Sequence, residues 1–156
     1  MNKTSFYIPI VISFSVVGSS IAVPPPQNYN ATRILDAIRQ VETGGEKDPA
    51  NAVGDDGKAI GPFQIHYVYW KDAVDFDSSI GGKYSDCKDE AYAKKIIVAY
   101  WTRYAPNWSD ETLSRVHNGG PKGNKKAKTL NYWQKVRKNL QKLTFWDIIG
   151  QKNRRK

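Results

Sequence analysis

The fold is decided by residues 41–65, which read VETGGEKDPANAVGDDGKAIGPFQI. Two glycines, Gly44 and Gly45, indicate the end of a helix, because glycine readily adopts the left-handed conformation that follows a last helical turn. The run Gly54 to Gly57 (GDDG) is a strong turn signal between two short apolar pairs. The stretch therefore predicts a helix that closes at Glu42 and a β-hairpin that follows it.

Helical patterns lie on both sides of this stretch. Upstream, Ile34, Ile38 and Val41 mark one face of a helix over 30–42, which Asn30 or Thr32 can cap. Downstream, we expect helices over 62–75, 89–104, 109–116 and 129–143. The chain shows no internal repeat and no sign of a second folded domain.

The first 22 residues have the order of a secretory signal peptide. A short basic start precedes the uncharged, mostly apolar run 6–17, and the small residues Ser20 and Ala22 indicate a cleavage site. The apolar run is too short to span a bilayer comfortably, which argues against an anchor and a transmembrane segment. We expect a secreted, extracellular chain with a Pro-rich leader over 23–32, a single folded domain over 33–150 and a basic tail over 151–156.

The charge of the chain is strongly divided along its length. The 156 residues carry a formal charge of +9 and are 40% hydrophobic, which is ordinary for a globular protein. Residues 122–156 hold twelve Lys or Arg and one acid, a net of +11, whereas residues 23–121 have a net of −3. This division fits a polyanionic partner, and it fits an ordinary solvated helix face equally well.

Cysteine and histidine are scarce. The single Cys87 excludes an intramolecular disulfide, and it is either a buried thiol, which we favour, or an intermolecular link. With two histidines and one cysteine, a zinc site of the usual kind is not expected, and neither is any other metal or cofactor.

Two acidic positions have the surroundings that glycoside hydrolysis requires. Such enzymes use one protonated carboxyl as an acid and one carboxylate as a nucleophile. A helix end and the apolar neighbour Val41 should raise the pKa of Glu42, whereas Asp55 on a polar turn should stay ionised. The plain alternative makes Glu42 a surface residue and Asp55 a turn former.

Four blocks of sequence resemble the invertebrate-type lysozymes, also called the destabilase family. They are VETGG at 41–45, GPFQI at 61–65, HNGGPKG at 117–123 and Tyr132-Trp133, and the resemblance covers about residues 33–138. It implies an α+β lysozyme-like fold: a mainly helical body, a small β-hairpin and a cleft between them. It implies Glu42 and Asp55 as the catalytic pair, with Asp56 as an alternative because the following segment is one residue short.

The same resemblance implies a muramidase that cleaves the β-1,4 bond between N-acetylmuramic acid and N-acetylglucosamine in peptidoglycan. Its candidate substrate-binding residues here are Gln64, Tyr69, His117 and Asn118. His117 equally fits a buried hydrogen-bonding slot, and Tyr69 fits either a sugar platform or the core.

The chain departs from the family in two ways. The family is rich in disulfides, but this chain lacks nearly all of the cysteines, so we expect packing around Trp70, Trp101 and Trp133 to stabilise it. It also lacks a serine in 58–60, where family members credited with isopeptidase activity have one, so that activity is not expected.

A second class of function also fits the composition. The basic, amphipathic residues 133–142 and the apolar ones that follow suit a non-enzymatic cationic antimicrobial protein that binds bacterial surfaces. Specific nucleic-acid binding is not expected, because no recognised motif accompanies the positive charge.

Overall fold

The computed structural model describes residues 22–44, 46–105 and 107–154, with side chains to residue 145. The expected signal peptide therefore lies outside the described residues, apart from Ala22. In the described part of the chain, no helix is both long enough and apolar enough to cross a membrane.

The described residues form five α-helices and a small antiparallel sheet, which confirms the expected α+β class. The helices are α1 (Thr32–Thr43), α2 (Tyr67–Phe76), α3 (Glu90–Tyr104), α4 (Asp110–Gly119) and α5 (Leu130–Arg154). The strands are β1 (Val53–Gly54), β2 (Ala59–Ile60) and β3 (Ile65–His66), in the order β1-β2-β3. The expected hairpin is thus present and gains a third strand.

The hairpin turn depends on three successive residues with positive φ. Asp55, Asp56 and Gly57 have φ of 51°, 54° and 88°. Asp and Gly are among the residues that tolerate this left-handed region, which explains why the turn is GDDG. The turn brings Gly54 opposite Ala59, and Val53 opposite Ile60.

Three helix boundaries differ from the sequence prediction by three residues or more. The second helix begins at Tyr67 and not at Pro62, because positive φ at Gly61 (73°) and Gln64 (48°) makes a turn that leads into β3. Helix α4 continues past Val116 to Gly119. The last helix continues past Leu143 to Arg154, through the position where the basic tail was expected to begin.

One buried cluster holds the helices and the sheet together. Its largest fully buried side chains include Trp101, Phe63, Ile96 and Leu113. The expectation for Trp101 is confirmed, whereas Trp70 and Trp133 are only partly buried and pack against the cluster from its edge. Cys87 is fully buried, and burial raises the pKa of its thiol to about 12, which agrees with the interpretation as a packed thiol.

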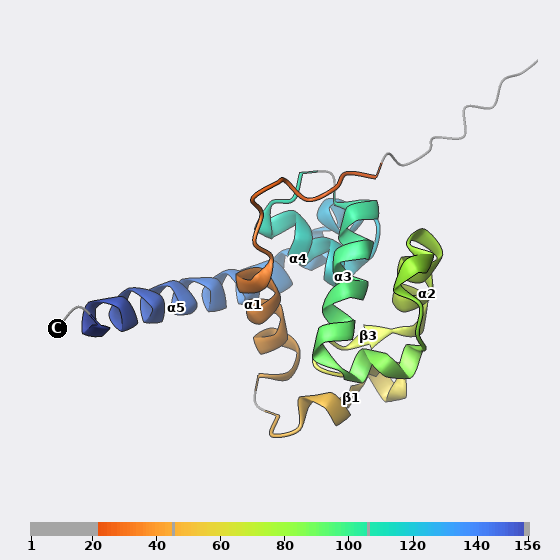
Figure 1. The fold of residues 1–156 in the computed structure, drawn as a ribbon, viewed down its shortest axis with the longest axis horizontal. Coiled ribbons are helices and arrows are strands. Elements are labelled where there is room, and N and C mark those ends of the chain that lie inside the picture. The colour runs from red at the N-terminus through yellow and green to blue at the C-terminus, as the bar shows by residue number, and fades with distance from the viewer. Residues whose placement is uncertain (1–21, 45, 106, 155–156) are drawn as a thin grey trace, which may run out of the picture.

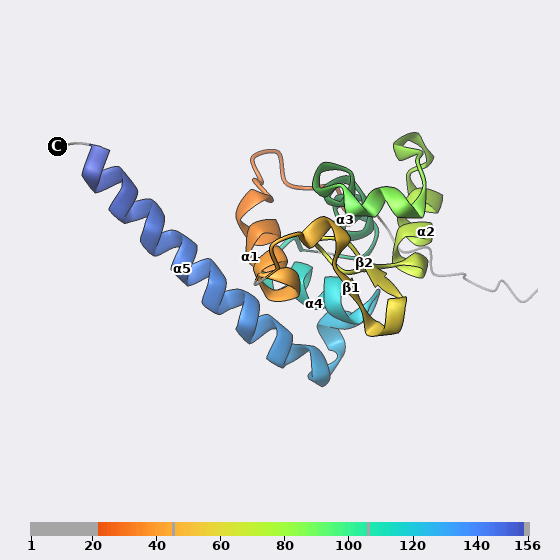
Figure 2. The same cartoon turned by 90° about the horizontal axis from the view of Figure 1, so that it is seen from below.

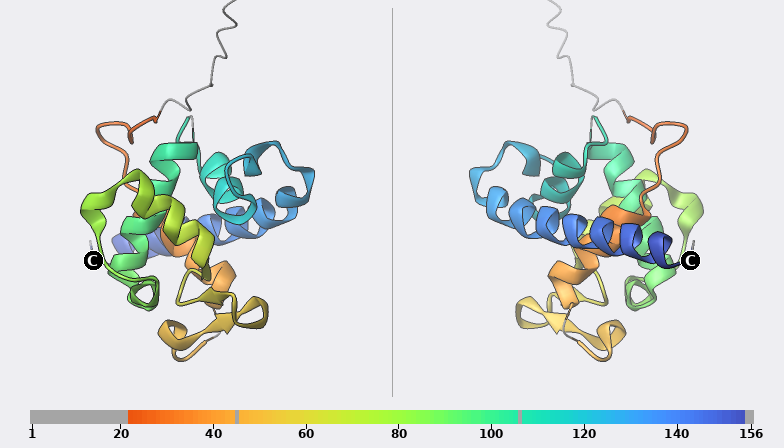
Figure 3. Two further views of the ribbon diagram at one scale, coloured as in Figure 1. Left: turned by 90° about the vertical axis from the view of Figure 1, so that its right-hand side faces the viewer. Right: turned by 90° about the vertical axis from the view of Figure 1, so that its left-hand side faces the viewer.

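The elements have a simple arrangement in space. The small sheet lies at the opposite end of the molecule from the N-terminal leader, as Figures 1 and 3 show. Helix α5 packs along α1, and its C-terminal part projects beyond the body (Figures 1 and 2). The start of α5 therefore lies against α1, which carries Glu42.

The Pro-rich leader is bound to the body of the protein. The Val23 amide donates to the Thr102 carbonyl at 2.9 Å, and the Trp108 indole N–H donates to the Val23 carbonyl at 2.7 Å. The Tyr29 hydroxyl donates to Asp110 at 3.1 Å. These bonds tie the leader to the end of α3 and the start of α4.

Candidate active site

The six candidate site residues lie around one pocket of about 280 Å³ between the sheet, α1, α2 and α4. The residues that line it are Glu42, Asp55, Ala59, Gln64, Ile65, His66, Tyr69, His117 and Asn118. Asp56, the alternative second carboxylate, is not among them. The six candidates come from five separate segments of the chain and line a single cavity.

Glu42 lies in the last turn of α1, and its side chain is only 19% exposed. The helix end is fixed to the sheet region by the Thr43 hydroxyl, which donates to the Pro62 carbonyl at 3.0 Å. Burial raises the pKa of Glu42, while a hydrogen bond from Tyr132 and the charge of Lys135 oppose that rise. The main cause of the shift is therefore burial in the pocket wall.

Asp55 has the opposite surroundings on the other side of the pocket. Its side chain is 62% exposed at the tip of the hairpin. His66 Nε2 lies 3.4 Å from Asp55 Oδ2, so β3 contributes a partner for this carboxyl. A buried carboxyl and a hydrated one in the same cavity are the arrangement that separates an acid from a nucleophile.

His117 is buried beside Glu42. Its Nε2 lies 3.8 Å from Glu42 Oε1, and its Nδ1 lies 3.4 Å from the Tyr69 hydroxyl. Burial lowers the pKa of His117 to about 4, although a backbone hydrogen bond with Phe63 opposes the shift. His117 fills a buried hydrogen-bonding slot, as one interpretation expected, and it also lines the pocket; its binding to substrate stays a prediction. At neutral pH it is an uncharged partner for Glu42.

Tyr69 belongs to the core as well as to the pocket wall. Its ring stacks on Tyr100, with 3.7 Å between ring centroids and 16° between the planes. One face of Tyr69 is therefore covered, and its hydroxyl is directed to His117. This geometry favours the core interpretation of the ring over a sugar-stacking platform.

Gln64 and Asn118 line the pocket in different ways. The Gln64 amide donates to the Gly61 carbonyl at 2.9 Å and to the Ala52 carbonyl at 3.3 Å, so it ties the turn before β3 to the hairpin. Asn118 is exposed near the end of α4. Of the two, Asn118 has the freer amide for a ligand.

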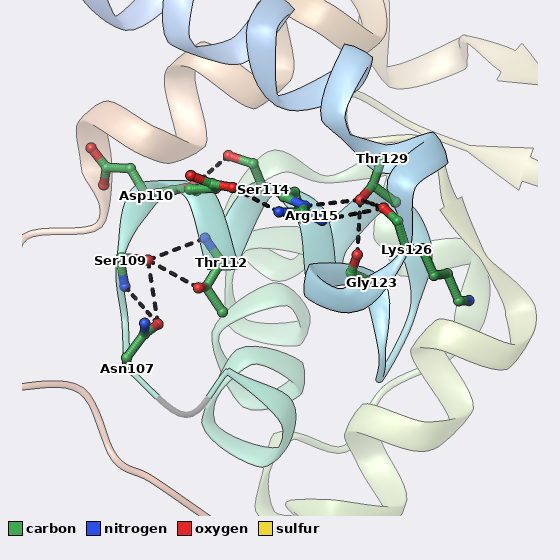
Figure 4. A network of polar contacts seen from close by, with 10 residues as sticks. Asn107, Ser109, Asp110, Thr112, Ser114, Arg115, Gly123, Lys126 and Thr129 are labelled. Atoms are coloured by element: carbon green, nitrogen blue, oxygen red, sulfur yellow. Dashed lines mark hydrogen bonds and ion pairs between the residues drawn. The ribbon is translucent and has the colours of Figure 1, made fainter.

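A polar network fixes the end of α4 and the loop that leads into α5 (Figure 4). Arg115 donates to Glu111 Oε1 at 2.7 Å, to the Thr129 hydroxyl at 3.0 Å and to the Lys126 carbonyl at 3.2 Å. The Thr129 hydroxyl in turn donates to the Gly123 carbonyl at 2.8 Å. This network sets the position of His117 on α4 relative to the first turn of α5.

Sequence reasoning did not identify two partners of the carboxyls. The Tyr132 hydroxyl donates to Glu42 Oε1 at 2.6 Å, although 90 positions separate the two residues. His66 contacts Asp55 across the sheet. The Tyr132-Trp133 block was visible as a motif, but nothing in the sequence shows which side chain the tyrosine meets. Among the described residues, no group of three or more His, Cys, Asp or Glu is placed to hold a metal ion.

Comparison with known sequences gives a consistent result. Residues 31–139 match the family model described as Destabilase. The lysozyme of Meretrix lusoria is 36% identical over 86 residues, covering 51% of this chain and 66% of that protein. Invertebrate-type lysozyme 6 of Caenorhabditis elegans is 30% identical over 121 residues, covering 70% of this chain and 86% of that protein. The matched segment spans only 43% of the length of Lysozyme 1 of Crassostrea virginica.

Comparison with solved structures supports the fold. The crystal structure of Tapes japonica lysozyme matches with a TM-score of 0.57 and 30% identity, over 67% of this chain and 85% of that chain. The crystal structure of Aeromonas hydrophila PliI in complex with Meretrix lusoria lysozyme contains a match with a TM-score of 0.58 and 32% identity, over 68% and 87% of the two chains. The helical body and small sheet therefore form a lysozyme-like fold.

Proposed function

Because this chain belongs to the destabilase family, which includes invertebrate-type lysozymes, we propose that it is a muramidase acting on bacterial peptidoglycan. The bond cleaved is the β-1,4 link between N-acetylmuramic acid and N-acetylglucosamine. The observation that carries the proposal is that Glu42 and Asp55, in opposite surroundings, line the same pocket.

Glu42 serves as the general acid in this proposal. An acid must hold its proton near neutral pH and release it as the glycosidic bond breaks. Burial raises the pKa of Glu42 toward that range. The opposing influence of Tyr132 and Lys135 keeps the carboxyl able to give the proton up.

Asp55 serves as the second carboxylate, attacking the sugar or stabilising positive charge at its anomeric carbon. It lines the pocket, which Asp56 does not, and its exposed position leaves it open to substrate. The exposed Asn118 would bind a sugar acetamido group. Tyr69 and Gln64 would act on substrate through the residues they hold in place.

Export and attraction to the bacterial wall belong to the same proposal. Residues 1–22 would direct secretion and be removed, so that the mature chain begins at Val23 with its leader bound to the body. The +11 net charge of residues 122–156 would attract the chain to anionic bacterial surfaces.

The experiment that tests the proposal is a cell-wall turbidity assay on the wild type and Glu42→Gln. We expect Glu42→Gln to lose at least ~100-fold of its activity, because an amide cannot donate the required proton. The matched control is Glu46→Gln, four residues further on, at an exposed position outside the pocket. Its activity should equal that of the wild type.

A bactericidal assay on the same variants separates the two classes of function. If Glu42→Gln kills bacteria as well as the wild type does, hydrolysis is not the mechanism. The protein would then act as a cationic antimicrobial through its basic C-terminal region.

A further inference from the structure

The first turn of α5 reaches into the wall of the active-site pocket. Tyr132, the third residue of α5, donates its hydroxyl hydrogen to Glu42 Oε1 at 2.6 Å. The pKa of Tyr132 lies well above its ordinary value because the phenol is buried and faces Glu42. The hydroxyl therefore remains a donor across the whole pH range in which Glu42 titrates.

We propose that Tyr132 is a positioning residue for the general acid: it occupies Oε1 of Glu42 and so places the transferable proton on Oε2. This inference rests on the proposed function. A neutral carboxyl carries one proton on one of its two oxygens, and Oε1 already accepts a hydrogen bond from Tyr132. His117 Nε2 also approaches Oε1, at 3.8 Å. Oε2 is thus left to carry the proton.

The proton transfer gives the Tyr132 contact a larger role in the transition state than in the resting enzyme. The bond between the anomeric carbon and the glycosidic oxygen breaks, and its electron pair stays on that oxygen. The proton leaves Glu42 Oε2 for the same oxygen, and a carboxylate remains. Tyr132 then donates to a charged oxygen, and charge-assisted hydrogen bonds are about twice as strong as neutral ones. An interaction that strengthens in this way raises kcat.

Helix α5 contributes a second influence on Glu42. Lys135 follows Tyr132 by three positions, close to one helical turn, and its positive charge lowers the pKa of Glu42. Titratable groups face Glu42 or its pocket from every element packed around it. These groups are Tyr132 and Lys135 on α5, His117 on α4, Tyr69 on α2, His66 on β3 and Asp55 on the hairpin.

The attachment of α5 to the body does not depend on the Tyr132 hydroxyl. Val136 on α5 is fully buried in the core, and Leu140 packs against the same cluster. Arg33 on α1 also donates to the Leu140 carbonyl at 3.4 Å. Removal of one hydroxyl should therefore leave the helix in place and release only the Glu42 carboxyl.

The first test compares Tyr132→Phe with Tyr104→Phe in steady-state kinetics across pH. Tyr104 is a matched control, because its hydroxyl also donates to a carboxylate, Asp72 Oδ2 at 2.7 Å, but Asp72 is not a pocket residue. We expect Tyr132→Phe to lower kcat roughly tenfold, the effect of losing about one hydrogen bond, with KM unchanged. The alkaline limb of the pH–rate profile of Tyr132→Phe should move to higher pH, because the Tyr132 hydroxyl lowers the pKa of Glu42 in the wild type. Tyr104→Phe should change neither kcat nor the pH–rate profile.

The second test measures the pKa of the Glu42 carboxyl directly and does not depend on enzymatic activity. In a ¹³C NMR titration, with the Glu42 signal assigned by its absence in Glu42→Gln, Tyr132→Phe should raise the pKa of Glu42. Replacement of Tyr132 by a fluorotyrosine, a stronger donor of nearly the same shape, should lower it. If the pKa of Glu42 is the same in both variants as in the wild type, the inference is wrong. If the wild type lacks muramidase activity but the titration moves as expected, the proposed function fails and the Tyr132 contact stands.

Discussion

The environments of single side chains determine what the two acidic residues of the pocket can do. Glu42 is enclosed between α1, α4 and α5, whereas Asp55 projects from the hairpin into solvent. The same functional group is thus mostly enclosed in one place and largely exposed in the other. Of the two turn aspartates, Asp55 lines the pocket and Asp56 does not.

Substitutions at the two turn aspartates should have opposite outcomes. We expect Asp55→Asn to abolish turnover of peptidoglycan, because only Asp55 of the two lines the pocket. Asp56→Asn should retain activity within about twofold. Asn is well tolerated at positive φ, so neither change should disturb the turn. Turbidity assays on both proteins, with circular dichroism as the folding control, check the prediction. An inactive Asp56→Asn beside an active Asp55→Asn would reverse the assignment.

His117 should make the fold sensitive to acid. Its pKa is about 4 in the folded protein and about 6.5 when unfolded, so the unfolded chain binds more protons between these values. The contribution of uncharged His117 to the free energy of unfolding is therefore complete above pH 6.5 and is lost as the pH falls toward 4. It amounts to roughly 3 kcal/mol at most.

His117→Gln keeps a polar side chain but removes this titration. The variant will be less stable than the wild type at pH 7, and we expect the difference in melting temperature to shrink as the pH falls to 4. Thermal unfolding at pH 7, 5.5 and 4 measures it. A constant difference across this range would show that protonation of His117 does not contribute.

At the scale of elements, sequence patterns predicted some boundaries well and others poorly, for identifiable reasons. Helix α3 was expected from Asp89 and begins at Glu90, because Asp89 is a side-chain cap that accepts from the Tyr92 amide at 2.7 Å. The predicted start of α2 was too early. Proline is common in the first turn of a helix, so Pro62 indicated a helix start, but Gln64 adopts a positive φ that a helix does not allow. The predicted end of α5 was also too early, because the regular apolar spacing stops at Leu143 whereas the helix continues to Arg154.

The contacts between elements could not be predicted from the sequence. The resemblance to a known family sufficed to select six residues that share a pocket. The pairing of Tyr132 with Glu42 depends on how α5 crosses α1, which is a property of packing and not of periodicity. The same applies to His66 and Asp55, which meet only because β3 joins the sheet.

The turn between β2 and β3 should tolerate no side chain at Gly61. Gly61 has a φ of 73°, and a Cβ there would lie 2.2 Å from the Cys87 carbonyl oxygen. We expect Gly61→Ala to destabilise the protein by about 2 kcal/mol or more, through backbone strain and this collision. Gly57→Ala is the control, since its φ is also positive but no atom beyond its own chain neighbours lies within 4 Å of its Cβ position. Urea unfolding of both variants should show the larger loss for Gly61→Ala.

At the scale of the whole molecule, the positive charge is concentrated at the C-terminal end of the chain. Deleting residues 151–156 removes four cations, Lys152, Arg154, Arg155 and Lys156, and no residue of the pocket. Attraction to bacterial walls weakens with salt, since the screening length falls from about 10 Å at 0.1 M to 3 Å at 1 M.

The truncated protein should therefore lyse whole cells more slowly and with less dependence on salt. Its rate on a short neutral oligosaccharide should not change. Lysis and oligosaccharide assays at several salt concentrations make the comparison. Equal losses on both substrates would mean that these residues support the fold or the site.

The bond between the Val23 amide and the Thr102 carbonyl joins the expected N-terminus of the mature protein to the end of α3. Thr102 lies in the last turn of α3, where backbone carbonyls give the helix a partial negative charge. If signal peptidase cuts after Ala22, the nitrogen at this position becomes the terminal ammonium of the mature protein. The cut that releases the chain from the export machinery would then also create the cation that this helix end accommodates. A recombinant protein that begins with a purification tag would present an uncharged peptide nitrogen there and would lack that contribution.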